Sequence, residues 1–340
     1  MSAKQPTIKE IAKRLNISIS TVSRALHDHA SIGLRTKTLV KQLAKELMYE
    51  PNQAAIFFQQ RKTFTIGVLL PFLSEAFFSA AISGIEDVAV KNQYTVLLGQ
   101  SRDDAERENQ IIHTMKKHRV DGLLISISKH TTAYGHFEML QKSGIPLVFF
   151  DCIPNMTDIH YVACNMVSGT VQAISYLLKK GHRVIGLING PEKLIASKQR
   201  QEGYQIAMSK HRLKYDPSLV VNSELSKEST CSVTKQLLSH KRKVTAIVTF
   251  NDYVAIDAMQ YADEQKVKIN KDVCFVSYAN LPLVQHLKFS PMASVEQYPY
   301  LQGQKAAEML IELLGKKDDE KEIHGSYKII VDSQLVVYSQ

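Results

Sequence analysis

A group of small polar side chains and one arginine lies close to the N-terminus, spaced as on the outer face of a short helix. Its members are Ile19, Ser20, Thr21, Ser23 and Arg24. Hydroxyl groups suit phosphate oxygens, an arginine can donate two parallel hydrogen bonds to guanine, and an isoleucine can contact a thymine methyl group. Together these residue types could recognise DNA. For Ile19 the alternative is that its side chain is partly buried within the protein, which would look the same in the sequence.

Two short helices joined by a tight turn are predicted to carry this group. Thr7 stands three residues before Glu10, which is the spacing of a capping box, so a first helix should start there. After a short break in the helical pattern, Ser18 can cap a second helix. A third helix should follow Gly33, and its inner stripe is expected to be Leu39, Leu43, Ala44 and Leu47.

Most of the net charge of the chain lies on these helices and on the segment that follows them. Residues 1–63 contain 11 Lys and Arg against 4 Asp and Glu, a net charge of +7, whereas the whole chain of 340 residues carries +9. The alternative is a generic three-helix bundle with a solvated charged face. The tight turn and the charge imbalance favour instead a helix-turn-helix, whose second helix enters the major groove of DNA.

From residue 65 onwards, short β-rich segments alternate with helical stretches. The segments that read as strands are 65–71, 94–99, 120–126, 146–151, 161–164, 183–190, 218–222, 246–250, 273–278, 293–297 and 335–338. Such alternation, with nearly continuous apolar strands, predicts parallel sheets covered by helices on both faces. More than ten strands indicate two sheets, and therefore a body with two α/β subdomains.

Polar side chains recur just after these strands, where ligands bind in open α/β sheets. Convergent hydrogen-bonding groups beside an aromatic wall would suit a small polar ligand. The residues expected at such a site are Phe72, Glu75, Phe77, Phe78, Ser101, Ser126, Asp151, Arg200, Asn251, Asp252, Asn280 and Gln297. For any single Asn, Asp or Ser, the alternative is a turn residue or a helix cap.

Other classes of function leave no pattern in the chain. The four cysteines are far apart and form no CxxC pair, so we expect neither a metal site nor a disulfide framework, and no cofactor. GxGxxG, GKS, GKT, GxSxG and HExxH are all absent, which argues against an enzyme. The apolar runs are too short to span a membrane and no secretory signal is recognisable, so the chain is expected in the cytoplasm.

The N-terminal segment resembles the opening of the lactose-repressor (LacI/GalR) family, in TIKEIAKRLNISISTVSRAL at 7–26 and YEPNQAA at 49–55. The resemblance implies base contacts by Ile19, Ser20 and Arg24, and phosphate contacts by Thr7, Thr21, Ser23 and Tyr49. It also implies a hinge helix in the minor groove with Asn52, Ala55 and Phe58 at the DNA, where Phe58 would wedge between base steps. The alternative is that Phe57 and Phe58 pack on the body.

The body resembles the same family and its relatives among periplasmic sugar-binding proteins, in segments such as IGVLLPFLSEAFFSAAISGIEDVA and AIVTFNDYVAIDAM. The implied fold is a small all-α helix-turn-helix DNA-binding domain plus an α/β periplasmic-binding-protein-like body of two Rossmann-like subdomains. The expected boundaries are 1–50 for the DNA-binding domain, 51–63 for the hinge helix and linker, and 64–340 for the body. Within the body, 64–163 and 293–324 should form the N-subdomain, and 164–292 and 325–340 the C-subdomain, joined by three crossovers.

The resemblance further implies an effector in the cleft between the subdomains. Its expected contacts are Arg200, Asn251 and Asp252, with Phe77 or Phe78 as an aromatic wall. The sequence departs from the pattern of the family in this cleft, because Glu75 and Cys152 replace the usual Asn and Arg, and Ala279 replaces an acidic residue. Loss of that acidic residue argues against a plain site for sugar hydroxyls.

These expectations describe a homodimeric transcriptional regulator, acting as a repressor, that binds near-palindromic double-stranded operator DNA. A small-molecule effector in the cleft, expected to be a carbohydrate or a sugar derivative, would control DNA binding allosterically. The alternatives are a solute-binding sensor and a sugar-processing α/β enzyme, both without a DNA role. The basic helix-turn-helix disfavours both.

Overall fold

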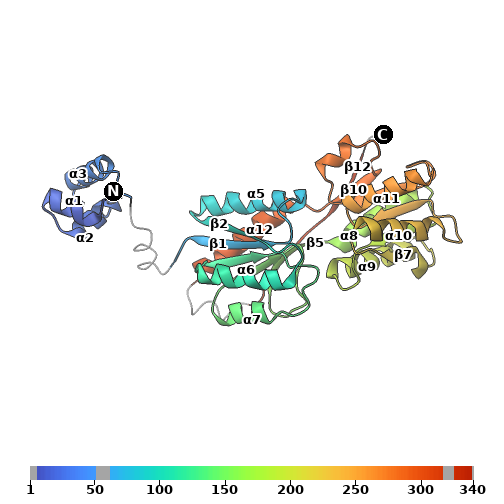
Figure 1. The fold of residues 1–340 in the computed structure, drawn as a ribbon, viewed down its shortest axis with the longest axis horizontal. Coiled ribbons are helices and arrows are strands. Elements are labelled where there is room, and N and C mark those ends of the chain that lie inside the picture. The colour runs from blue at the N-terminus through green and yellow to red at the C-terminus, as the bar shows by residue number, and fades with distance from the viewer. Residues whose placement is uncertain (1–5, 51–61, 317–324, 339–340) are drawn as a thin grey trace. The chain divides into compact units, whose positions relative to one another are not determined.

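The computed structural model describes residues 6–50, 62–316 and 325–338, so the predicted DNA contacts Asn52, Ala55 and Phe58 lie outside the described residues. The chain divides into two compact units, Met1–Thr63 and Phe64–Gln340. The first unit is helical, and the second alternates strands and helices (Figure 1). Each unit has hydrophobic clusters of its own and is described by itself below.

In residues 6–50, the described part of the N-terminal unit, the helices are α1 (Ile8–Leu15), α2 (Ile19–Leu26) and α3 (Leu34–Glu46). Asn16 makes the turn between α1 and α2 with a φ of 51°, in the left-handed region that asparagine enters more readily than most residues. Ile11, Val22, Ala25 and Val40 are fully buried where the helices meet. The predicted helix-turn-helix is therefore confirmed.

Two details of the predicted helices are wrong. Glu10 does not complete a capping box, because its Oε1 accepts a hydrogen bond from Arg14 Nη2 at 2.7 Å, one turn along the helix. Thr7 precedes α1 without a side-chain capping bond. In α3, Leu39 is 48% exposed and the neighbouring Val40 takes its place in the core.

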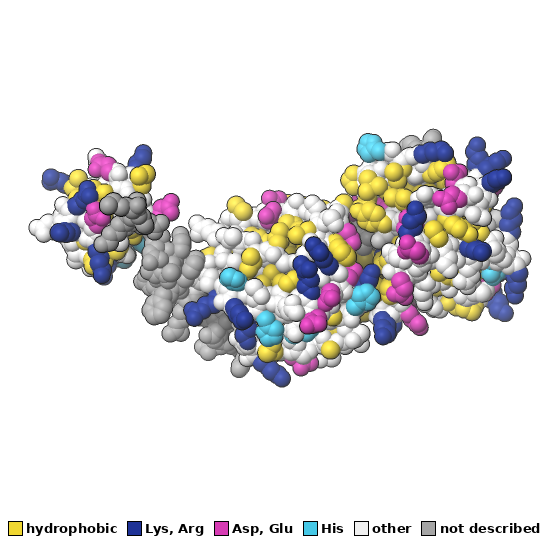
Figure 2. Space-filling model, in the orientation of Figure 1, with side chains coloured by type: hydrophobic (Ala, Val, Ile, Leu, Met, Phe, Trp, Pro, Cys, Tyr) yellow, Lys and Arg dark blue, Asp and Glu magenta, His cyan; other side chains and the backbone are white. Residues whose placement is uncertain are grey.

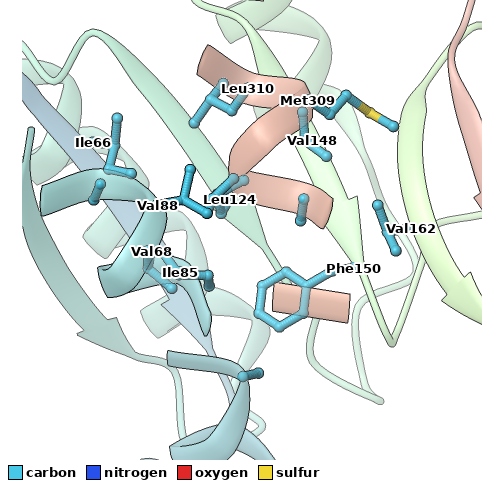
Figure 3. Packing of buried hydrophobic residues seen from close by; sticks show 14 of the residues in the cluster. Ile66, Val68, Ile85, Val88, Leu124, Val148, Phe150, Val162, Met309 and Leu310 are labelled. Atoms are coloured by element: carbon cyan, nitrogen blue, oxygen red, sulfur yellow. The ribbon is translucent and has the colours of Figure 1, made fainter. Parts of the chain in front are cut away.

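The first subdomain of the body is built on a sheet of six parallel strands. Its order is β11 (Lys328–Val331), β5 (His160–Cys164), β4 (Leu147–Phe150), β3 (Gly122–Ile125), β1 (Thr65–Leu70) and β2 (Thr95–Gln100). Helices α5 (Ala76–Lys91) and α12 (Pro299–Gly315) pack on one face, and α6 (Ala105–Lys117) and α7 (Gly135–Lys142) pack on the other. Figure 3 shows Val68, Leu124 and Phe150 of the sheet facing Ile85 and Val88 of α5.

The second subdomain repeats this arrangement with an antiparallel strand at one edge. Its sheet has the order β12 (Gln334–Val337), β10 (Ala293–Glu296), β9 (Cys274–Tyr278), β8 (Ala246–Thr249), β6 (Ile185–Asn189) and β7 (Val220–Asn222), and only β12 runs antiparallel. One face is covered by α8 (Met166–Lys179) and α9 (Ile195–Lys210), the other by α10 (Lys227–Leu238) and α11 (Asp252–Glu264). Short 3-10 helices occupy Pro217–Leu219 and Pro282–His286.

The chain passes between the two subdomains three times: after β5, after β10 and after β11. This number of crossovers agrees with the expectation, but two predicted boundaries are wrong. The strand at 293–296 belongs to the second sheet rather than to the N-subdomain, and residues 328–331 form an edge strand of the first sheet that the sequence pattern did not reveal. That strand is easily missed because it is half-exposed, with Ile330 51% accessible.

Candidate DNA interface and ligand cavity

The second helix of the N-terminal unit presents a polar outer face. Ser18 caps it, since its Oγ accepts a hydrogen bond from the backbone N–H of Thr21 at 3.0 Å. Ile19 is 46% exposed, and Ser20 and Arg24 are also exposed. Within the described residues, the Arg24 side chain makes no hydrogen bond or ion pair, so its guanidinium is available to a partner. An exposed cation beside hydroxyl groups on a recognition helix is suited to base edges and phosphates.

The other predicted DNA contacts that lie within the described residues differ in exposure. Thr21 and Ser23 are half-buried, Thr7 is exposed, and Tyr49 is half-buried against the core of the N-terminal unit. Burial raises the pKa of the Tyr49 hydroxyl above its ordinary value, so this group stays a neutral hydrogen-bonding group. In Figure 2, Lys and Arg side chains are spread over the visible face of this unit and outnumber acidic ones.

A cavity of about 620 Å³ lies between the two subdomains of the body and is lined by residues from both. Eight of the twelve predicted effector residues line it: Phe72, Glu75, Phe77, Phe78, Asp151, Arg200, Asn251 and Gln297. This volume lies within the usual range of small-molecule sites, which combine apolar walls with a few placed polar groups.

Arg200, on α9, is the most deeply buried cation of the cavity wall, with 2% of its surface exposed. Its Cζ lies 4.0 Å from the ring centre of Phe250 and 4.4 Å from that of Tyr278, so two aromatic rings hold the guanidinium. Nη1 donates to the carbonyl oxygen of Ala196 at 3.2 Å, but Nε has no hydrogen-bond partner. A buried guanidinium with an unused donor is prepared for an acceptor that a ligand would bring.

Two carboxyl groups with raised pKa values lie in the same cavity. Burial raises the pKa of Asp151 to about 6, while Cys152 and Arg200 act in the opposite direction. Burial, followed by the negative charges of Asp151 and Asp103, raises the pKa of Glu75 to about 7. Lys129 opposes that shift only in part. Proton uptake by this part of the cavity therefore falls close to neutral pH.

The remaining four predicted effector residues do not line the cavity, and each has a partner inside the protein. Ser101 donates to the carbonyl oxygen of Leu70 at 3.5 Å. Ser126 donates to Asp151 Oδ2 at 3.5 Å and thus lies behind the cavity wall. The carboxylate of Asp252 accepts hydrogen bonds from the hydroxyls of Ser277 and Ser294, the latter at 3.0 Å, and from the N–H of Leu281 at 2.7 Å. The side-chain amide of Asn280 donates to Glu296 at 2.8 Å and accepts from the hydroxyl of Tyr338 at 2.7 Å. For these four, the strand-end pattern reflects internal hydrogen bonding.

Several residues of the cavity wall were not predicted from the sequence. The polar ones are Ser74, Asp103, Lys129 and Tyr253, and the neighbouring Cys152 also reaches the wall. Asp103 and Lys129 form an ion pair, with Lys129 Nζ 3.4 Å from Asp103 Oδ2. Asp103 lies three residues beyond the end of β2, and Lys129 lies four residues beyond the end of β3. The sequence signal for this ion pair is therefore a charged residue a few positions into each loop and not directly after the strand.

Glu75→Gln should make the chain more stable at about pH 8 and change its stability much less at about pH 5. The folded-state pKa of Glu75, about 7, lies above the ordinary value of 4.5. Its ionisation therefore costs folding free energy as the pH rises through this window, and the cost is complete above it. The full shift corresponds to ~3 kcal/mol, and contact with water in the cavity reduces the expected gain to about 1 to 2 kcal/mol.

Thermal melting at both pH values measures this effect. The matched control is Glu86→Gln, at an exposed position on α5, the helix that begins directly after Glu75. It should change neither melting point. A Glu75→Gln variant that melts below the unsubstituted chain at about pH 8 would contradict the proposed environment of this carboxyl group.

The described residues were also compared with the requirements of a metal site and of a membrane-spanning helix. The described ranges contain no group of three or more His, Cys, Asp or Glu side chains arranged to hold a metal ion. In the same ranges, every helix is too short or too polar to cross a lipid bilayer. The cavity and the polar helix face are thus the two features of the described chain that the sequence singled out for function.

Comparison with known proteins agrees with this organisation. Residues 7–52 match the bacterial regulatory proteins of the lacI family, and residues 63–332 match the periplasmic binding proteins and sugar binding domain of the LacI family. The HTH-type transcriptional repressor PurR of Escherichia coli O1:K1 is 30% identical over 317 residues, which cover 92% of each protein. PurR of Vibrio atlanticus is 27% identical over 331 residues, 97% of this chain and 98% of its own length.

A crystal structure of the Lac repressor dimer bound to operator and the anti-inducer ONPF has the same fold, with a TM-score of 0.82, 22% identity and 98% of each chain covered. The chain belongs to the LacI family of bacterial regulatory proteins.

Proposed function

We propose that this chain is a cytoplasmic transcriptional repressor that binds operator DNA as a homodimer and is controlled by a small molecule in the cavity of its body. One observation carries the proposal: a single chain contains both an exposed polar recognition helix and a cavity with a buried, incompletely bonded arginine. The PurR relatives are named as transcriptional repressors, and the related Lac repressor structure contains both operator and a small-molecule ligand. These names favour repression over enzymatic or purely solute-binding roles.

The position of the cavity supports allosteric control. Its wall includes Phe72 and Asp151 from the first subdomain, and Arg200 and Asn251 from the second. A ligand that contacts both sides stabilises the subdomain arrangement that it fits best, and shifts the population towards it. In a symmetric dimer each chain supplies one recognition helix, so the operator should contain two inverted half-sites.

Selection of DNA from a random library, followed by titration of the selected duplex, tests the proposed function. We expect two inverted half-sites, two chains per duplex and an affinity about a thousandfold above that for random DNA at the same salt concentration. Equal affinity for selected and random duplexes would contradict the proposal.

Arg24→Ala should relax base preference at one position of each half-site by about 1 to 3 kcal/mol, because a forked guanidinium contact to guanine is lost. Competition between duplexes that differ at that position measures the effect. Arg35→Ala, at an exposed position on α3, is the control and should not alter base preference. If Arg24→Ala weakens specific and random DNA equally, Arg24 contacts phosphate instead of a base.

A further inference from the structure

The cavity contains more carboxylate than its cations neutralise. Asp103 is paired with Lys129, and Asp151 lies near Arg200. The side chain of Glu75, however, makes no hydrogen bond or ion pair within the described residues, although it lies on the cavity wall and within the influence of Asp151. A partly buried carboxylate without a partner is costly, and a positive charge brought by a ligand would remove that cost.

Two other polar groups of the cavity wall, Arg200 and Gln297, are suited to hydroxyl groups. Arg200 lines the cavity, and within the described residues only its Nη1 is hydrogen-bonded, to the carbonyl oxygen of Ala196. Gln297 is 5% exposed, and in the same residues its side-chain amide has only a weak partner, Met166 Sδ at 3.6 Å. Phe72 and Tyr253 add aromatic surface to the cavity, and Tyr253 lies near Glu75. Aromatic rings beside convergent donors and acceptors can hold a compact polyhydroxylated ligand.

From this arrangement we infer that the effector is an amino sugar, whose protonated amine lies between Glu75 and Asp151 and whose hydroxyl groups face Arg200 and Gln297. The inference rests on the proposed function and adds the chemical class of the effector. A phosphorylated sugar fits less well, because its negative charge would meet three carboxylates while Lys129 is already paired with Asp103. A neutral sugar would leave the Glu75 carboxylate without a partner.

Ligand binding should therefore depend on pH. The charged groups around Glu75 are Asp103, Lys129 and Asp151, and the hydroxyl of Tyr253 also faces it. Around Asp151 lie Arg200 and the thiols of Cys152 and Cys164. The raised pKa values of both carboxyl groups mean that an ammonium ion meets more ionised carboxylate at about pH 8 than at about pH 6. Affinity for a hexosamine should rise from about pH 6 to about pH 7 as these carboxyl groups ionise, and fall again at higher pH as the amine of the ligand loses its proton, whereas affinity for a neutral hexose should do neither.

Binding of six sugars to the full chain tests the inference. Glucosamine, galactosamine and mannosamine are compared with glucose, galactose and mannose by thermal shift and calorimetry, with glucose 6-phosphate as the anionic probe. We expect at least one hexosamine to bind about tenfold or more tightly than its parent hexose at about pH 7, where both the ammonium ion and the carboxylates are populated. Glu75→Gln should remove most of that preference and its pH dependence, whereas the exposed control Glu86→Gln should keep both.

Operator binding by the same preparations separates the two claims. A chain that binds selected operator DNA but prefers a neutral hexose or glucose 6-phosphate, or binds none of the probes, overturns the amino-sugar inference and leaves the repressor proposal in place. A chain that binds no operator sequence above random DNA overturns the proposed function itself. Retained operator binding by Glu75→Gln shows that the variant is folded, so its loss of hexosamine preference counts as support.

Discussion

Deletion of residues 1–61 should abolish operator binding, with a loss of about a thousandfold or more, while leaving a folded body that still binds its small molecule. Residues 1–63 carry +7 of the total charge of +9, and they contain the whole recognition helix. The rest of the chain carries only +2 and therefore has little attraction for phosphates. Because the body forms a separate unit with its own cores, the deletion should not unfold it.

Gel retardation of the selected operator, together with thermal melting, measures this result. The control is the melting transition of the body, which should have the same midpoint in the truncated and the full chain. A truncated chain that still retards operator DNA specifically would show that the body contributes a sequence-reading surface, contrary to our assignment.

Arg200→Ala should weaken effector binding by about 2 to 4 kcal/mol and leave operator binding insensitive to the effector. The guanidinium is buried between Phe250 and Tyr278, and its Nε lacks a partner inside the protein. Removal of this group takes away both a forked donor and the positive charge that faces Asp151. No other residue of the wall offers the same planar set of donors.

Two variants keep this experiment interpretable. Arg200→Met preserves much of the side-chain volume between the two rings and should lose effector binding as the alanine variant does, without a packing defect. Lys198→Ala, at an exposed position on the same helix, should bind effector normally. Unchanged effector affinity in Arg200→Met would remove Arg200 from the site.

The N-terminal unit shows which features of a helical bundle can be predicted from sequence. Ser18 was recognisable as a cap because its chemistry acts three residues away, on the N–H of Thr21. The inner stripe of α3 was predicted one residue out of place at Leu39, because Leu39 and Val40 both stand at helical spacing from Leu43 and Ala44. Only packing against α1 and α2 selects between them, and that packing is not local in sequence.

The body shows a similar division between local and long-range information. Regular alternation of strands and helices predicted both sheets, but β11 was missed because its apolar run at 329–331 is only three residues long and stands just before the predicted strand at 335–338. The strand-end pattern found Asn251, which both caps α11 and lines the cavity. It could not distinguish Asn251 from its neighbour Asp252, which is fully buried and bonded to Ser277 and Ser294. The distinction depends on partners many residues away along the chain.

The central claim is that the cavity and the recognition helix are coupled, and reciprocal binding measurements test it most directly. The affinity of the full chain for a small molecule that raises its melting point is measured with and without saturating operator duplex. Coupling requires the two affinities to differ, by a factor of about 5 to 150, and the affinity for operator must change by the same factor when the small molecule is saturating. Identical affinities with and without operator would show that the cavity does not control DNA binding.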